Sequence, residues 1–186
     1  MEGLSLPMIC PTGFYCPTTS MIDPIVCPIS YYCPLEGMIT PTICPLGSYC
    51  PSTGLKAQKL CTIGNYCNSQ GMKLQELCPV GNYCPNSGTI TPTPCLQGTF
   101  NNKTGSSTIS DCLQSPPGFY SPISGLQLSY TCPSGSFCPN FGMSSPYKCN
   151  IGTYNSKESS VWETDCLTCP AGFYCPVSGM NLPYNC

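Results

Sequence analysis

Hydrophobic residues in this chain follow no sustained helical or strand period. Pro or Gly interrupts every run of ten residues, so no window supports a helix of useful length. Short apolar or aromatic pairs recur between turn residues instead, which predicts short β-hairpins joined by extended coil. We therefore expect a small disulfide-rich repeat array with almost no helix and no single hydrophobic core.

One motif, C-P-x-G-x-[YF]-C, recurs throughout the chain at a spacing of 17 residues, with three-residue insertions after Cys112 and Cys166. A short fixed period is typical of repeat architectures, in which each repeat contacts only its neighbours. The period thus predicts hairpins stacked into an elongated rod. The copies lie at 10–16, 27–33, 44–50, 61–67, 78–84, 95–101, 115–121, 132–138, 149–155 and 169–175.

Several columns of the motif have a physical interpretation. The sixth position is aromatic in every copy, and we expect these rings to pack between repeats, in preference to forming a carbohydrate-binding ladder. The fourth position is Gly, or Ser30 in one copy, which predicts a turn with positive φ. A second column holds Met or Leu interchangeably, which indicates hydrophobic packing between repeats in preference to Cu(I) binding. The aromatic column comprises Tyr15, Tyr32, Tyr49, Tyr66, Tyr83, Phe100, Tyr120, Phe137, Tyr154 and Tyr174.

Composition narrows the function. The 186 residues include 19 Cys, no His and six Lys or Arg, with a net charge of -2. Without His there is no imidazole base and no His metal ligand, and the charge offers no footprint for nucleic acid. We predict no enzyme activity and no cofactor. The Cys content indicates disulfides and hence an extracellular or cell-surface location, and no stretch is apolar enough for a membrane helix.

Exceptions within the repeat indicate how the cysteines pair. Ser115 and Ser121 replace both Cys of one copy, as expected when the two Cys of a copy are bonded to each other and are lost together. In two other copies Asn101 and Asn155 replace only the second Cys. The first Cys of each of these copies can then pair with a later Cys, Cys112 or Cys166. A rival register, which joins each second Cys to the first Cys of the next copy, strands Cys10 and stays open. The favoured sequential scheme is Cys10–Cys16, Cys27–Cys33, Cys44–Cys50, Cys61–Cys67, Cys78–Cys84, Cys95–Cys112, Cys132–Cys138, Cys149–Cys166 and Cys169–Cys175, with Cys186 unpaired.

Two stretches carry a family resemblance. Residues 95–112, CLQGTFNNKTGSSTISDC, and 149–175, CNIGTYNSKESSVWETDCLTCPAGFYC, share C-x-x-G-T-[YF], and the second adds the junction D-C-x-x-C-P-x-G-x-Y. They resemble ephrin-receptor-like (GCC2/GCC3) cysteine-rich repeats, which are related to tumour-necrosis-factor-receptor and growth-factor-receptor modules. In that family the first Cys usually bridges to the Cys that closes the module, which implies the pairs at 95–112 and 149–166. The compact CPxGxYC copies depart from it by adding a Cys after the aromatic residue.

The resemblance implies an elongated, non-catalytic extracellular stalk, as in large surface proteins of single-celled eukaryotes. The motifs divide the chain into tandem repeats at 1–94, an ephrin-receptor-like module at 95–131, one repeat at 132–148, and a module with the start of a further repeat at 149–186. Because both ends fall inside the pattern, we expect a fragment of a longer array.

The remaining chemical candidates are few. Cys166 and Cys169 form a C-x-x-C, but without His or a second C-x-x-C we interpret it as structural. Glu163 and Asp165 are expected to be solvated surface groups. Asn102 opens the sequon Asn-Lys-Thr and is a candidate for N-glycosylation. We predict a structural component of an extracellular rod, fibril or coat, with copies of itself, neighbouring repeats and glycans as partners. The alternative is the stalk or ligand-binding ectodomain of a receptor.

Overall fold

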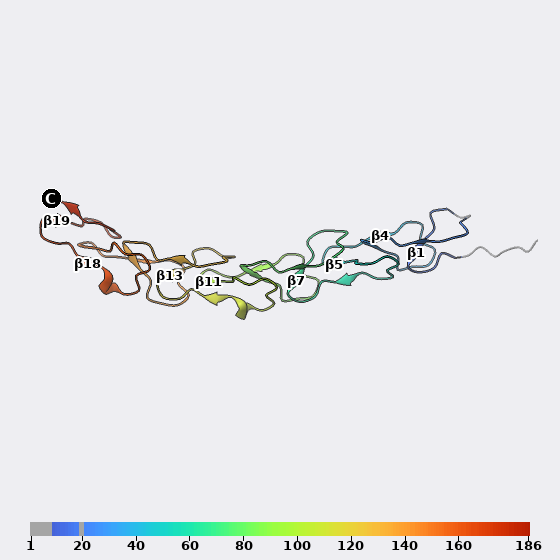
Figure 1. Ribbon diagram of the computed structural model, residues 1–186, viewed down its shortest axis with the longest axis horizontal. Helices are drawn as coiled ribbons and strands as arrows, with labels where there is room; N and C mark the ends of the chain where they lie inside the picture. Colours follow the sequence, from blue (N-terminus) through green and yellow to red (C-terminus); the bar gives the residue numbers. More distant parts are fainter. Residues whose placement is uncertain (1–8, 19–20) are drawn as a thin grey trace, which may run out of the picture. The chain divides into compact units, whose positions relative to one another are not determined.

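The computed structural model describes residues 9–18 and 21–186. Within them, ten two-stranded antiparallel hairpins follow one another in chain order (Figure 1). Two single-turn 3-10 helices, η1 (Ile109–Asp111) and η2 (Glu163–Asp165), are the helical content of this part. The predicted fold class, a small disulfide-rich repeat array of short hairpins, is confirmed.

Each hairpin occupies one repeat, counted from the first position of the motif, and uses motif positions five and six as its first strand. The first strands are β1 (Phe14–Tyr15), β3 (Tyr31–Tyr32), β5 (Ser48–Tyr49), β7 (Asn65–Tyr66), β9 (Asn82–Tyr83), β11 (Thr99–Phe100), β13 (Phe119–Tyr120), β15 (Ser136–Phe137), β17 (Thr153–Tyr154) and β19 (Phe173–Tyr174). Their partners are β2 (Ile25–Val26), β4 (Thr42–Ile43), β6 (Lys59–Leu60), β8 (Glu76–Leu77), β10 (Thr93–Pro94), β12 (Leu113–Gln114), β14 (Tyr130–Thr131), β16 (Tyr147–Lys148), β18 (Leu167–Thr168) and β20 (Tyr184–Asn185).

A tight turn begins each repeat. In the repeat 44–60, the Ser48 amide donates a hydrogen bond to the Pro45 carbonyl at 3.2 Å, and Gly47 between them has a φ of 76°. A type II turn requires this left-handed conformation at its third residue, which is why Gly fills the column. Ser30 adopts the same conformation, with a φ of 74°. The predicted turn with positive φ is confirmed at both residues.

The turn also closes the hairpin. The amide of the residue after the second strand donates to the turn carbonyl, as Cys61 does to Gly47 at 3.0 Å. The aromatic residue of the motif lies opposite the first residue of the second strand, so Tyr49 pairs with Lys59 and Tyr120 with Tyr130. Two-residue strands bury little surface, and such a hairpin is not stable alone in water.

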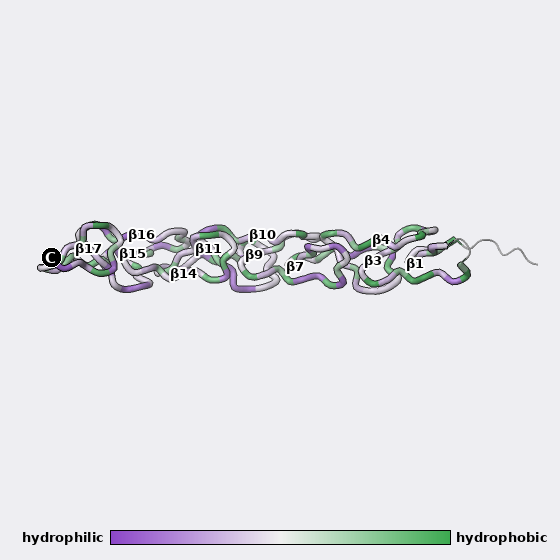
Figure 2. Tube along the Cα trace, turned by 90° about the horizontal axis from the view of Figure 1, so that it is seen from above, coloured by the Kyte–Doolittle hydropathy of each residue, from purple (hydrophilic) through white to green (hydrophobic). Residues whose placement is uncertain are grey.

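The buried apolar side chains are mostly cystine sulfurs. Among the described residues, the buried apolar side chains are Cys residues together with Met143 and Met180. Hydrophobic and hydrophilic stretches alternate over short distances along the chain, as Figure 2 shows. The predicted lack of a single hydrophobic core is confirmed for the described residues, because nearly all of their buried apolar side chains belong to separate bridges, with an occasional Met.

The chain divides into two compact units. The first holds the described residues up to Cys78 and the segment Cys84–Pro92, and the second holds Pro79–Tyr83 and Thr93–Cys186. The four segments predicted from the motifs, 1–94, 95–131, 132–148 and 149–186, describe sequence patterns and stay a prediction.

Candidate functional site

The repeat junctions are the recurrent feature from which a function can be argued. In the part of the chain that the structure describes, no three His, Cys, Asp or Glu side chains gather as a metal-binding group. That part also contains no helix with the length and apolar character to cross a membrane. The chemistry to be explained is therefore how each repeat is closed and how it joins the next.

Among the described residues there are nine disulfides, one in each repeat except 115–131, with Cα–Cα separations of 5.5 to 6.2 Å. They are Cys10–Cys16, Cys27–Cys33, Cys44–Cys50, Cys61–Cys67, Cys78–Cys84, Cys95–Cys112, Cys132–Cys138, Cys149–Cys166 and Cys169–Cys175. These are the pairs of the sequential scheme, and each lies inside one repeat. Cys186 is exposed and has no bridge among the described residues.

Three backbone hydrogen bonds join consecutive repeats at every described junction except that between 78–94 and 95–114, where only the bond from Gly81 N to Asn101 O forms. The turn residue and the residue at position seven each donate to the next repeat, and a loop residue of that next repeat, a Gly or in one case Ser159, donates back. The donor–acceptor distances at these junctions fall between 2.6 and 3.1 Å. Between repeats 44–60 and 61–77 the bonds run from Gly47 N to Cys67 O at 2.9 Å, from Cys50 N to Met72 O at 2.8 Å, and from Gly71 N to Cys44 O at 2.8 Å.

The expectation that each repeat contacts only its immediate neighbours is wrong. A Cβ placed on Gly47 of repeat 44–60 would lie 2.6 Å from the carbonyl oxygen of Gly88. Gly88 belongs to repeat 78–94, which is the next but one along the chain. The loop that carries Gly88 joins the two short strands β9 and β10 and is much longer than either strand. It therefore extends past the adjoining repeat and reaches the one before it. Gly47 is therefore required by this close approach as well as by its positive φ.

The aromatic column is half-buried except for Tyr174, which is 48% exposed. Tyr120 packs against Cys132, Cys138 and Met143, all of the next repeat. Three pairs of rings also meet across single hairpins, and these pairs are Tyr120 with Tyr130, Phe137 with Tyr147, and Tyr174 with Tyr184. Aromatic rings thus pack both within a repeat and, for Tyr120, against the next repeat. Packing between repeats by the other rings of the column stays a prediction.

Two buried asparagines, Asn101 and Asn155, take the place of the second Cys of the motif and form hydrogen bonds there. Both are 1% exposed. The Asn101 Nδ2 donates to the Asn82 carbonyl of the preceding repeat at 2.9 Å and to Ser106 Oγ at 2.8 Å, while the Lys103 amide donates to its Oδ1 at 3.0 Å. Asn155 repeats this arrangement with Ser136, Ser160 and Lys157.

This role was missed because each Asn was interpreted only as the loss of a Cys. Aligning the two inserted modules reveals the signal, since Asn-x-Lys-x-x-Ser occurs at 101–106 and at 155–160. In each module the Asn side chain donates a hydrogen bond to the Ser five residues later. The recurrence of both residues at this spacing is therefore the signal of a paired Asn and Ser.

Asp111 and Asp165 organise the inserted loops. The Asp111 Oδ2 accepts hydrogen bonds from the Ser107 and Thr108 amides, both at 2.9 Å. These backbone donors, that of Thr108 first, lower the pKa of the Asp111 carboxyl below its ordinary value. Asp165, expected to be a solvated surface group, accepts from the Val161 and Trp162 amides in the same way.

The repeat 115–131 has no disulfide. Ser115 and Ser121 stand at the two Cys positions, both are fully buried, and their hydroxyl oxygens are 2.7 Å apart in a hydrogen bond. The pair occupies the site of a bridge and gives each buried hydroxyl a hydrogen-bond partner.

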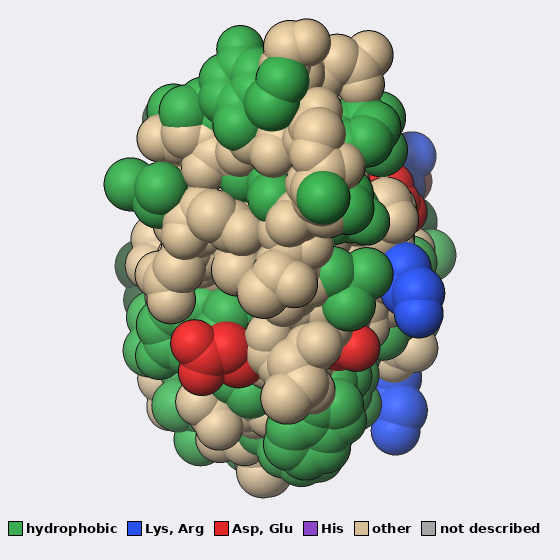
Figure 3. Space-filling model, turned by 90° about the vertical axis from the view of Figure 1, so that its left-hand side faces the viewer, with side chains coloured by type: hydrophobic (Ala, Val, Ile, Leu, Met, Phe, Trp, Pro, Cys, Tyr) green, Lys and Arg blue, Asp and Glu red, His purple; other side chains and the backbone are tan. Residues whose placement is uncertain are grey.

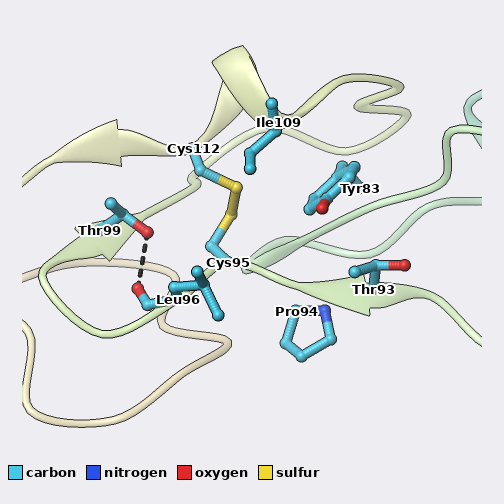
Figure 4. A pocket seen from close by; sticks show the side chains of 8 residues that line it. All are labelled: Tyr83, Thr93, Pro94, Cys95, Leu96, Thr99, Ile109 and Cys112. Atoms are coloured by element: carbon cyan, nitrogen blue, oxygen red, sulfur yellow. Dashed lines mark hydrogen bonds between the residues drawn. A yellow bond between two sulfur atoms is a disulfide. The ribbon is translucent and has the colours of Figure 1, made fainter.

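One cavity of about 170 Å³ lies beside the Cys95–Cys112 bridge. Figure 4 shows Tyr83 facing this bridge, with Ile109 on the same side and Leu96 below. The second inserted module carries Asn150 and Glu163 at the positions of Leu96 and Ile109. The cavity is smaller than ordinary small-molecule sites of about 300–1,000 Å³.

Asn102, the candidate N-glycosylation site, is exposed, as are Lys103 and Thr104 of its sequon. It directly follows the buried Asn101, so the loop presents one amide to solvent and keeps the other inside. Its modification stays a prediction.

No protein-family model matches the chain, and the comparison with curated proteins gives no match. The fold and the bridges nonetheless define a class. The protein is a cysteine-rich repeat array of disulfide-closed hairpins, and bridges of this number indicate an oxidising environment.

Proposed function

We propose that the protein is a non-catalytic structural component of an extracellular rod, fibril or surface coat. The observation that carries this proposal is the recurrence of the same three hydrogen bonds at every described junction except that between 78–94 and 95–114. Equivalent junctions let an array grow by adding repeats without changing any contact. The resemblance to ephrin-receptor-like repeats supports an extracellular location.

The surface supports association with other copies. Only 8% of the residues are charged, and large hydrophobic side chains such as Ile22, Leu74 and Trp162 are 65% or more exposed. The space-filling view shows hydrophobic side chains among polar ones, with few charges (Figure 3). A surface with few charges and many exposed apolar groups favours lateral contact between molecules.

Electron microscopy of native, non-reduced protein tests the proposal. We expect filaments or sheets whose features repeat at the spacing of the hairpins, and we expect them to vanish after reduction and alkylation. Particles that remain monomeric at every concentration would contradict an assembling structural role. The reduced sample is the matched control, because its sequence and concentration are unchanged.

One observation favours the alternative, a ligand-binding receptor ectodomain. Leu96 and Ile109 line the cavity beside Cys95–Cys112, whereas the equivalent positions of the second inserted module are the polar Asn150 and Glu163. The apolar cavity is thus specific to one module, which is typical of a binding site in a receptor and not of a uniform fibre. Saturable binding of a soluble extracellular ligand, abolished by Leu96→Asn together with Ile109→Glu, would support the receptor. Binding that is unaffected by these substitutions would exclude the cavity.

A further inference from the structure

Aromatic pairs across the strands distinguish three hairpins of the second unit. The ring centroids are 6.0 Å apart for Tyr120 and Tyr130 and 5.6 Å apart for Tyr174 and Tyr184. The third pair has the same register and a centroid distance of 5.7 Å, but one member is Phe137. Two hairpins therefore hold two phenols side by side, and the third holds one.

The pair Tyr120 and Tyr130 belongs to the repeat that has no disulfide. The preceding bridge ends at Cys112 and the following one begins at Cys132, so no covalent cross-link lies between these two residues. The Ser115–Ser121 hydrogen bond stands at the positions of the missing bridge, and the two facing rings lie across the strands β13 and β14. A link between the two phenols would give this repeat its only covalent cross-link.

The surroundings hold one ring and leave the other accessible. Tyr120 is half-buried against Cys132, Cys138 and Met143 of the next repeat, which fixes its position. Tyr130 is 48% exposed and directly opposite Tyr120 in the strand register. The planes meet at 70°, with the edge of one ring towards the other. Coupling of the two rings therefore requires the exposed Tyr130 side chain both to rotate and to move towards Tyr120, which its exposure permits.

We propose that Tyr120 and Tyr130 form an oxidative cross-linking site that yields dityrosine. A haem peroxidase with hydrogen peroxide as the oxidant removes one electron and the hydroxyl proton from each phenol. The two radicals join through their ortho carbons, and the protons on those carbons move to the oxygens to restore both phenols. Two C–H bonds are lost, one C–C bond forms, and the two hydrogen atoms reduce one peroxide to two waters.

The cross-link closes the 115–131 hairpin with a bond that thiols do not reduce. Tyr174 and Tyr184 are competent for the same reaction, in a repeat that already has the Cys169–Cys175 bridge. This chemistry goes beyond the proposed structural function, because it depends on the ring pairs alone and holds equally for a receptor ectodomain.

The test treats native protein with a haem peroxidase and hydrogen peroxide, followed by reduction, alkylation and tryptic digestion. We expect dityrosine fluorescence and a peptide spanning residues 104–148 that has lost two hydrogen atoms, with fragmentation that places the link between Tyr120 and Tyr130. The yield should not change on tenfold dilution, since the reaction is intramolecular.

Substitutions separate the pair from other tyrosines. Tyr130→Phe should lower the yield of this cross-link at least tenfold. The matched control Tyr147→Phe should leave it unchanged, because Tyr147 faces Phe137 and has no phenol partner. Phe137→Tyr should create a new link to Tyr147, which keeps the test decisive if a loss-of-function variant is unstable. The proposal is overturned if native protein gives no Tyr120–Tyr130 link, or if unfolded, alkylated protein gives the same yield.

Discussion

The repeats 115–131 and 132–148 are neighbours with different closures. The second has the Cys132–Cys138 bridge, whereas the first has two buried hydroxyls in a hydrogen bond. Their hairpins nevertheless share one register, and both pair an aromatic residue with a Tyr across the strands.

Their junctions are also alike. The three hydrogen bonds that join repeat 115–131 to the next are each 2.8 Å long, and those of repeat 132–148 range from 2.6 to 2.9 Å. The bridge is thus not required for the shape of a repeat. The turn, the close approach at Gly and the junction hydrogen bonds set the geometry, and the disulfide adds stability by limiting the unfolded chain.

Reduction of every disulfide should have the largest effect on the stability of the protein. A bridge that closes seven residues contributes about 2 kcal/mol and one that closes 18 residues about 3 kcal/mol in the loop-closure treatment. Reduction of all nine should exceed the net stability of a typical domain, about 5–15 kcal/mol, and unfold the protein. Near-ultraviolet circular dichroism of reduced, alkylated protein should be lost. A retained signal would show that junction contacts alone suffice.

Crowding a junction should have the next largest effect. Gly47→Ala adds a methyl group 2.6 Å from the Gly88 carbonyl oxygen at a residue with positive φ, and it should cost about 3–4 kcal/mol. Gly37→Ala is the matched control, because its φ is 70° and nothing lies within 4 Å, so it should cost about 1 kcal/mol. Urea unfolding measures both. Equal costs would mean that only backbone conformation matters.

Removing the buried amide of an inserted module should cost somewhat less. Asn101→Ala strands the Asn82 carbonyl, Ser106 hydroxyl and Lys103 amide, for a loss of about 2–3 kcal/mol. Asn102→Ala, on the exposed neighbour, should change the free energy of unfolding by less than about 0.5 kcal/mol. The comparison uses unglycosylated protein. If both variants unfold alike, the hydrogen bonds of Asn101 do not stabilise the module.

Restoring the missing bridge sharpens the comparison. Ser115→Cys with Ser121→Cys should form a tenth disulfide, because the hydroxyls already lie in contact, and should raise the unfolding free energy by about 2 kcal/mol. Free thiols are counted by alkylation and mass spectrometry. The single variant Ser115→Cys should give no gain. The double variant should retain only the free thiol of Cys186, and three free thiols would contradict the equivalence of the sites.

The smallest effect concerns the loop at Asp111. Its carboxyl pKa is lowered because backbone amides bind the charged form, so its contribution is present above the unfolded pKa near 3.8 and lost as pH falls through the folded pKa. The Ser107 and Thr108 amide signals in nuclear magnetic resonance should therefore shift in acid. Asp111→Asn should abolish that shift, and persistence of the shift would assign it to another group.

The sequence predicted the repeats well because its period and turns are local. Gly47 and Ser30 mark positive φ, and the joint replacement at Ser115 and Ser121 pointed to the pairing that the structure contains. The reach to the second repeat was not predictable, since the contact between Gly47 and Gly88 depends on the path of a loop. Asn101 escaped notice because a buried amide network has no strong signature in one copy.

Residue-resolved hydrogen exchange of the native protein tests most directly whether the junctions set the shape. The donors Gly118, Ser121 and Gly142 of the bridge-free junction should be protected, as should Gly135, Cys138 and Ser159 of the next. Protection factors of the first set should be lower by about a factor of thirty, because the missing bridge removes about 2 kcal/mol of stability. Unprotected amides at the first set alone would show that the hairpin needs its disulfide to form, and would contradict the conclusion.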